Sequence, residues 1–168
     1  MKNRVVVTGV GIVSPIGNRI EDFTDSLKSG INGVRKITLF DTSDHSVHIA
    51  AECSINLEDY IEKKELNKLD RFTALSLIAS EQAIKQAELV KSDNLDNIGV
   101  IVGSGIGGIN TFEKQHKRLI QHPRKVSPYF IPTMISDIAA GQISIKYGFK
   151  GINYGIVSAC ATGSHAIG

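Results

Sequence analysis

The sequence predicts an α/β fold in which a mostly parallel sheet is flanked by helices. Three short runs rich in valine and isoleucine lack the alternation of a half-buried strand; they cover residues 4–8, 98–102 and 154–157. Segments with helical spacing separate these runs, and each run ends in small residues. Uninterrupted apolar strands separated by helices are typical of parallel sheets that are covered on both faces.

Composition sets the broad class of protein. The chain has 168 residues, of which 42% are hydrophobic and 21% charged, so we expect one soluble globular domain with a real core. Its 19 Lys and Arg against 17 Asp and Glu give a net charge of +2, which argues against nucleic acid as a partner. The first apolar run is too short and too rich in glycine for a secretory signal or a membrane span, so we expect a cytoplasmic protein.

The two cysteines, Cys53 and Cys160, are too few for a disulfide framework. No cluster of cysteine and histidine has the spacing of a zinc site, so we expect reduced thiols and no metal.

The first run, residues 4–8, predicts a buried strand that leads into the glycine-rich loop Gly9–Gly17. Asn18 is expected to cap a short helix that continues to Leu27, because its side chain can accept a hydrogen bond from the first turn. Gly30 is the expected stop of that helix. This part of the chain is a strand–helix unit.

The middle of the chain predicts a half-buried strand and then helices. Apolar and polar residues alternate over residues 47–53, which places Cys53 on the apolar side, most simply in the core. Residues 57–68 are charged and expected to be helical in part. Asp70 can cap the long helix that follows, whose apolar stripe runs through residues 72–87.

A second glycine turn, Gly103–Gly108, follows the strand predicted at residues 98–102 and precedes a helix at 111–120. Its letters GSGIGG match the dinucleotide-binding pattern, but a basic stretch at 114–125 stands where an acidic residue is needed. We therefore favour close backbone packing over nucleotide binding for these glycines.

The chain then passes through an irregular connection into another helix. Residues 121–132 contain three prolines and should carry Arg124 and Lys125 outward. Residues 134–147 have helical apolar spacing, and Gly148 is the expected stop.

Cys160 follows the third predicted strand and opens a run of small residues that can form a closely packed helix. A helix N-terminus favours an anion, so a cysteine placed there is biased toward the nucleophilic thiolate. The competing interpretation is a small core residue. Ligands of parallel sheets bind at the carboxyl ends of the strands, where the Gly9 loop, the Gly103 loop and Cys160 should all lie, and this favours a functional thiol.

None of the five histidines is well placed as a base for this thiol. His165 follows Cys160 by five residues, which puts it about 140° round a helix. A cysteine hydrolase would need a histidine within reach of the sulfur.

Four motifs resemble, in order, the N-terminal half of the β-ketoacyl-[acyl carrier protein] synthases, most closely type II. They are RVVVTGVGIVSPIGN, NIGVIVGSGIGG, PRKVSPYFIPTMI and VSACATGSHAIG, and together with the intervening chain they cover essentially all of the sequence. The resemblance implies a thiolase-like αβαβα fold made of two similar halves, a homodimer, a role in fatty-acid elongation and no cofactor. Residues 1–168 would be the N-terminal half. The family's catalytic histidines, its lysine and its second oxyanion amide belong to the other half, so we expect a fragment that is inactive alone.

The resemblance also implies roles for individual residues. Cys160 would be the nucleophile that takes an acyl chain from acyl carrier protein before condensation with the malonyl thioester, and its own N–H one oxyanion donor. Ile106, Phe130 and Met134 would line the acyl pocket, with Phe130 reaching across the dimer.

Four basic residues resemble the family's contacts to the acidic carrier protein: Lys64, Lys68, Arg124 and Lys125. Asn67 stands where a further basic residue is often found. Two alternatives stay open: these cations are merely solvated, or the chain is a non-catalytic carrier-binding or assembly module of the same fold.

Overall fold

The computed structural model describes residues 4–89 and 94–168. The chain divides into two compact units. The first comprises Met1–Asn56 with Ile78–Ala87, and the second comprises Leu57–Leu77 with Glu88–Gly168. The boundary falls within the long helix α3 (Arg71–Gln86), so each unit contains part of that helix.

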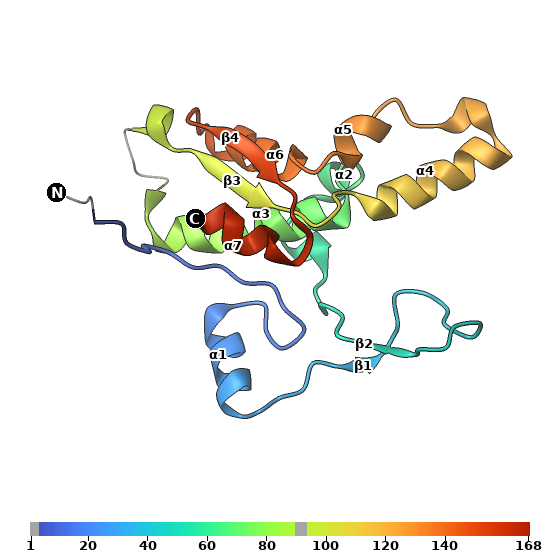
Figure 1. Ribbon diagram of the computed structural model, residues 1–168, viewed down its shortest axis with the longest axis horizontal. Helices are drawn as coiled ribbons and strands as arrows, with labels where there is room; N and C mark the ends of the chain where they lie inside the picture. Colours follow the sequence, from blue (N-terminus) through green and yellow to red (C-terminus); the bar gives the residue numbers. More distant parts are fainter. Residues whose placement is uncertain (1–3, 90–93) are drawn as a thin grey trace. The chain divides into compact units, whose positions relative to one another are not determined.

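The first unit contains one helix and a short hairpin besides its part of α3. Helix α1 (Ile20–Lys28) is followed by β1 (Arg35–Lys36), which pairs antiparallel with β2 (Ile49–Ala50) (Figure 1). The predicted cap by Asn18 is wrong: the N-cap is Arg19, and the Asn18 amide instead donates to the carbonyl of Ser54 at 3.0 Å. Gly30 lies beyond the end of α1 with a φ of 65°, as expected of a helix stop.

The strand predicted at residues 4–8 is not formed, and that prediction is wrong. Val5 is 91% exposed and Val7 84% exposed. The chain that follows lies along α3, where the side-chain oxygens of Gln86 and Gln82 accept the backbone N–H groups of Val10 and Ile12 at 2.6 and 3.1 Å. A strand needs a neighbour to satisfy its backbone groups, and none is present for residues 4–8 in the described part of the chain.

The half-buried strand predicted at residues 47–53 is reduced to the two residues of β2, and Val47 and Ile49 are exposed. A two-residue ribbon has too little surface to bury an alternating face. Cys53 is only partly buried, whereas a place in the core was predicted. Its Sγ lies 3.9 Å from the carbonyl oxygen of Val13.

The second unit begins with the helices predicted after residue 57. A 3-10 turn, η1 (Leu57–Asp59), precedes α2 (Lys63–Leu66) and the first part of α3. Asp70 caps α3 as predicted, because its Oδ1 accepts the Phe72 N–H at 3.3 Å. Its Oδ2 also accepts the Thr111 N–H at 2.7 Å, so this carboxylate, only 4% exposed, joins the starts of two helices.

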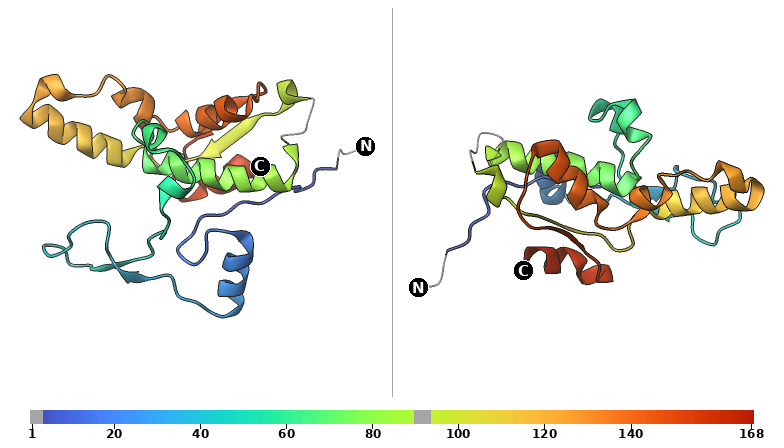
Figure 2. Two further views of the ribbon diagram at one scale, coloured as in Figure 1. Left: turned by 180° about the vertical axis from the view of Figure 1, so that it is seen from behind. Right: turned by 90° about the horizontal axis from the view of Figure 1, so that it is seen from above.

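A parallel strand pair forms the centre of the second unit. β3 (Val100–Gly103) and β4 (Asn153–Ile156) pair in the register that sets Gly103 opposite Ile156. Helix α6 (Ile138–Tyr147) contacts the pair on one face and α7 (Thr162–Ile167) on the other (Figure 2). Buried residues of α6 and the buried Val100 belong to this core. The parallel, two-sided arrangement is therefore confirmed for two of the three predicted strands.

Between the strands the chain makes three further elements: α4 (Ile109–Gln121), the 3-10 turn η4 (Pro123–Lys125) and α5 (Phe130–Met134). The connection predicted to be irregular up to residue 132 thus becomes helical at Phe130. Helix α6 starts at Ile138 rather than at residue 134, and Gly148 ends it with a φ of 71°, as predicted. A 3-10 turn, η3 (Leu95–Asn97), precedes β3.

Candidate active site at Cys160

Cys160 lies in the turn that leaves the carboxyl end of β4. The turn is the 3-10 segment η5 (Ala159–Ala161), and α7 begins directly after it. Ala159 has a φ of 49°, a left-handed conformation that costs a residue with a Cβ about 1–2 kcal/mol. The thiol is exposed, so the interpretation of Cys160 as a core residue is wrong. A strained turn that presents a thiol at a sheet edge is an arrangement suited to nucleophilic attack.

Thr162 holds this turn against the neighbouring strand. Its side chain is buried, and its Oγ1 accepts the N–H of Ser158 at 2.8 Å. A Cβ added at Gly103 would overlap the Thr162 methyl group and would lie 2.9 Å from the Thr162 carbonyl oxygen. The absence of a side chain at Gly103 therefore lets the end of β3 approach the cysteine turn.

The histidine nearest in sequence to Cys160 is engaged elsewhere. His165 Nδ1 lies 2.7 Å from the hydroxyl oxygen of Ser158. Across residues 4–89 and 94–168, no histidine nitrogen is within hydrogen-bonding distance of the Cys160 sulfur. The local requirement for a cysteine hydrolase is not met by these residues.

The second glycine turn packs against the segment that ends α5. Gly107 has a φ of 80°, and a Cβ there would lie 2.5 Å from the carbonyl oxygen of Met134. That same oxygen accepts the Gly108 N–H at 2.8 Å. These contacts explain two of the glycines by close backbone approach, which supports packing over a nucleotide loop. Because β3 and β4 are parallel, this turn and the cysteine turn leave the same end of the pair, as predicted.

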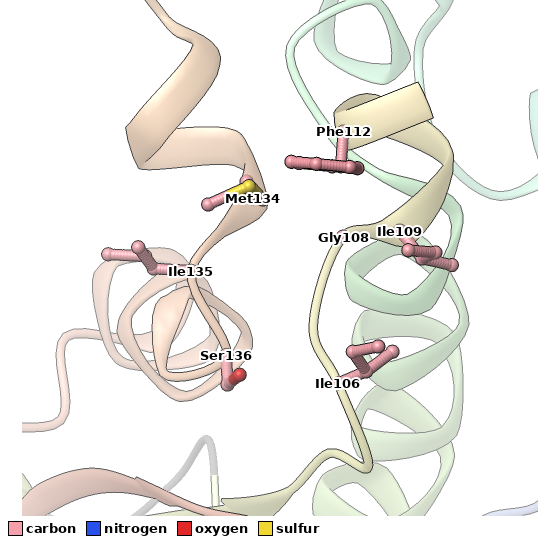
Figure 3. Close-up of a pocket in the computed structure, with 7 residues that line it drawn as sticks. All are labelled: Ile106, Gly108, Ile109, Phe112, Met134, Ile135 and Ser136. Atoms are coloured by element: carbon pink, nitrogen blue, oxygen red, sulfur yellow. The ribbon is translucent and has the colours of Figure 1, made fainter. Parts of the chain in front are cut away.

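An apolar cavity of about 450 Å³ lies beside the second glycine turn (Figure 3). Its volume is within the range of small-molecule sites. The lining residues come from the turn, the start of α4 and the chain after α5: Ile106, Gly108, Ile109, Phe112, Met134, Ile135 and Ser136.

The structure thus brings together two of the three residues predicted for an acyl pocket, Ile106 and Met134. Phe130 does not line this cavity; its ring contacts Phe112, with 6.3 Å between centroids. Sequence reasoning missed the wall formed by Ile109 and Phe112. The available signal was a pair of apolar residues three positions apart at the start of an amphipathic helix.

The four predicted carrier contacts are all exposed. Lys64 lies on α2, and Arg124 and Lys125 form η4. Lys68 lines a second cavity, of about 380 Å³, which contains two further cations from α4. Phe130 also lines that second cavity.

A metal centre needs clustered ligands, and a membrane span needs a long apolar helix. No group of three or more potential metal ligands is found in the described residues. In the same residues, no helix has both the length and the apolar character needed to cross a bilayer.

Solved ketosynthases share this arrangement. A β-ketoacyl synthase from Burkholderia phymatum STM815 superposes with a TM-score of 0.79 at 24% identity, covering 99% of this chain and 42% of that one. A type II polyketide ketosynthase, solved in complex with its acyl-carrier protein, gives a TM-score of 0.78 at 27% identity over 99% of this chain and 46% of that one. The fold is that of the thiolase-like ketosynthases, and the predicted fold class is confirmed.

The family model "Beta-ketoacyl synthase, N-terminal domain" matches residues 2–168, and the chain belongs to this family. A 3-oxoacyl-[acyl-carrier-protein] synthase 2 of Staphylococcus aureus (strain N315) is 50% identical over 98% of the chain. The chain spans 41% of the length of that relative. The family resemblance predicted from the four motifs is confirmed.

Proposed function

We propose that residues 1–168 form the N-terminal half of a β-ketoacyl-[acyl carrier protein] synthase that lengthens acyl chains in the cytoplasm. The observation that carries the proposal is the exposed thiol of Cys160. It lies on a positive-φ turn at the carboxyl edge of a parallel strand pair, in a chain of the β-ketoacyl synthase family.

In the first step the sulfur of Cys160 attacks the carbonyl carbon of an acyl group carried as a thioester. A bond forms between that carbon and Sγ, the bond to the carrier's sulfur breaks, and the proton of Cys160 leaves with the carrier thiol. The Cys160 N–H is one donor proposed for the oxyanion that develops during attack. The product is an acyl-cysteine.

In the second step a malonyl group on acyl carrier protein loses CO2. The electrons of the broken C–C bond attack the carbonyl carbon of the acyl-cysteine, and the bond to Sγ breaks. The carrier then holds a 3-oxoacyl group two carbons longer, and the cysteine is restored as thiolate. No metal or cofactor enters this balance. The histidines and the lysine that assist these steps are expected in the part of the protein beyond these residues.

The apolar cavity beside the second glycine turn supports acyl binding, since burying each CH₂ of a chain contributes about 0.8 kcal/mol. Ile106 and Met134 line it. Phe130, which contacts a wall residue, Phe112, is proposed to reach across a homodimer interface.

The test compares the two cysteines in the natural full-length gene product. Acyl and malonyl carrier proteins are supplied, and CO2 release and 3-oxoacyl carrier are measured. We expect Cys160→Ala to lower 3-oxoacyl formation by a factor on the order of 10³ or more, while Cys53→Ala keeps most of it. Product formation at an unchanged rate by Cys160→Ala contradicts the proposal. Carrier binding without any product from the unsubstituted protein would instead favour the non-catalytic module.

A further inference from the structure

The second cavity is polar, and the charged residues described in its lining are all cations. It lies between the end of α2, one face of α4 and the chain from residue 127 to 133. Three of its lining side chains are cations, Lys68, Lys114 and Arg118, and none of the described lining residues is a carboxylate. The remaining lining residues are neutral: Leu66, Asn67, Leu69, Thr111, Gln115, Ser127, Tyr129, Phe130 and Thr133.

None of these three cations is neutralised within the described parts of the chain, residues 4–89 and 94–168. In these ranges no carboxylate oxygen lies within 4 Å of Lys68, Lys114 or Arg118. The same helix provides a contrast, because Lys117 pairs with Glu113 at 2.5 Å. The Lys117 ammonium lowers the pKa of Glu113, mainly by hydrogen bonding and also by charge attraction. Of the three Lys and Arg side chains on α4, Lys117 is thus paired, whereas Lys114 and Arg118 have no such partner among the described residues.

The walls of this cavity are tied together by hydrogen bonds. Gln115, only 6% exposed, accepts the Ser127 N–H at 2.9 Å through its Oε1 and so fixes the chain after α4 to the helix. Asp70 fixes the start of α4 by accepting the Thr111 N–H. The hydroxyl of Thr133 lies 3.4 Å from the carbonyl oxygen of Lys68. Hydrogen bonds thus hold together the segments that carry the three cations, and the cations themselves are exposed.

We propose that Lys114 and Arg118 dock acidic side chains of the acyl carrier protein, and that they extend the carrier-contact surface from α2 onto α4. This inference rests on the proposed function. Asn67, the position where a basic residue is often found in the family, lines the same cavity as the two new cations. Lys114 and Arg118 thus supply positive charge where Asn67 does not.

The position of the two residues along α4 supports the same surface. Lys114 and Arg118 are four residues apart, about 6 Å along the helix, and therefore face one way. Lys68 lies at the cavity they share, and Arg124 and Lys125 follow directly after the end of α4. In the sequence Lys114 and Arg118 stand between Lys68, with which they share a cavity, and the two cations of η4. Positive charges on a docking surface speed the encounter with an acidic partner and favour one orientation.

The test uses the natural full-length gene product with Lys114→Ala and Arg118→Ala combined. Acylation of Cys160 is measured with one acyl group presented on acyl carrier protein and, separately, on pantetheine. We expect the ratio of kcat/KM for the carrier substrate to that for the pantetheine substrate to fall on the order of fivefold, chiefly through the carrier KM. Added salt should lower kcat/KM for the carrier substrate more in the unsubstituted protein than in the variant.

Lys117→Ala is the matched control on the same helix, and we expect it to leave the ratio within about twofold. A second variant, Lys114→Gln with Arg118→Gln, keeps most of the side-chain stems and replaces the alanine variant if that unfolds. An unchanged ratio in the folded double variant, or an equal fall for Lys117→Ala, overturns this inference and leaves the proposed function standing. Failure of both substrates to acylate Cys160 in the unsubstituted protein overturns both.

Discussion

Residues 4–8 and strand β3 are two valine-rich segments with different outcomes. β3 pairs with β4 over four register positions, from Val100 opposite Asn153 to Gly103 opposite Ile156. Residues 4–8 have no strand beside them in the described structure, and two of their valines are almost fully exposed. Apolar residues make both segments suitable for burial, yet only a neighbouring strand satisfies the backbone N–H and C=O groups. The partner decides whether the strand forms.

The glycine turns that follow the two segments pack against different elements. A Cβ at Gly9 or Gly11 would overlap carbonyl oxygens of α3, so the first turn packs on a helix. A Cβ at Gly103 would overlap Thr162, so the second turn packs on the segment that carries the nucleophile. Of these two turns, only the second packs against the segment next to Cys160, so a change in its packing should affect the proposed chemistry.

The largest expected effect comes from breaking the contact between β3 and the cysteine turn. Gly103→Ala places a methyl group into buried Thr162, and we expect a loss of about 2 kcal/mol in the free energy of unfolding and slower acylation of Cys160. Denaturant titration and a thiol-acylation assay measure the two effects. Gly105→Ala is the control, because among the described residues other than its two chain neighbours no atom lies within 4 Å of the added Cβ. We expect its change to be within about 0.5 kcal/mol. Equal losses for the two variants would refute this account of Gly103.

A smaller effect should follow when the first segment is detached from α3. Gln82 accepts the Ile12 N–H and donates to the carbonyl oxygens of Ile12 and Asn18. Within the described chain, Gln86 accepts only the exposed Val10 N–H. We expect Gln82→Ala to lower the free energy of unfolding by about 1–2 kcal/mol, more than Gln86→Ala does. Denaturant titration of both variants gives the difference. A larger loss at Gln86 would show that another interaction holds this segment.

The smallest effect concerns the strained turn itself. Ala159→Gly removes the penalty of a Cβ at positive φ, and we expect a gain of about 1 kcal/mol in the free energy of unfolding. Ala161→Gly is the control, since Ala161 has a φ of −86° and glycine there should cost about 0.5–1 kcal/mol. A stability loss at both positions would mean that Ala159 is not strained.

Features that depend on neighbouring residues in the sequence were predictable. The cap by Asp70, the stop at Gly148 and the strands around Val100 and Tyr154 follow from capping, positive φ and apolar runs. The shared edge for the second glycine turn and Cys160 follows from parallel pairing. These predictions needed no knowledge of distant contacts.

Features that depend on distant partners were not predictable. The missing strand at residues 4–8 depends on a neighbour that no local pattern specifies. The Asn18 amide bonds a carbonyl 36 residues away instead of capping α1. Local sequence marks Lys114 and Arg118 only as part of a basic stretch, and tertiary packing is needed to show that Lys68 shares their cavity. Competition between a local cap and a long-range hydrogen bond explains the difference at Asn18.

The most direct test of the central claim is the mass of the peptide that contains Cys160. The natural full-length gene product is mixed with acyl-pantetheine in the absence of any malonyl donor, quenched in acid and digested. We predict the mass of one acyl group on the Cys160 peptide, close to one per chain, and little on the Cys53 peptide. Acyl mass on Cys53 or on neither cysteine would contradict the claim that Cys160 is the nucleophile.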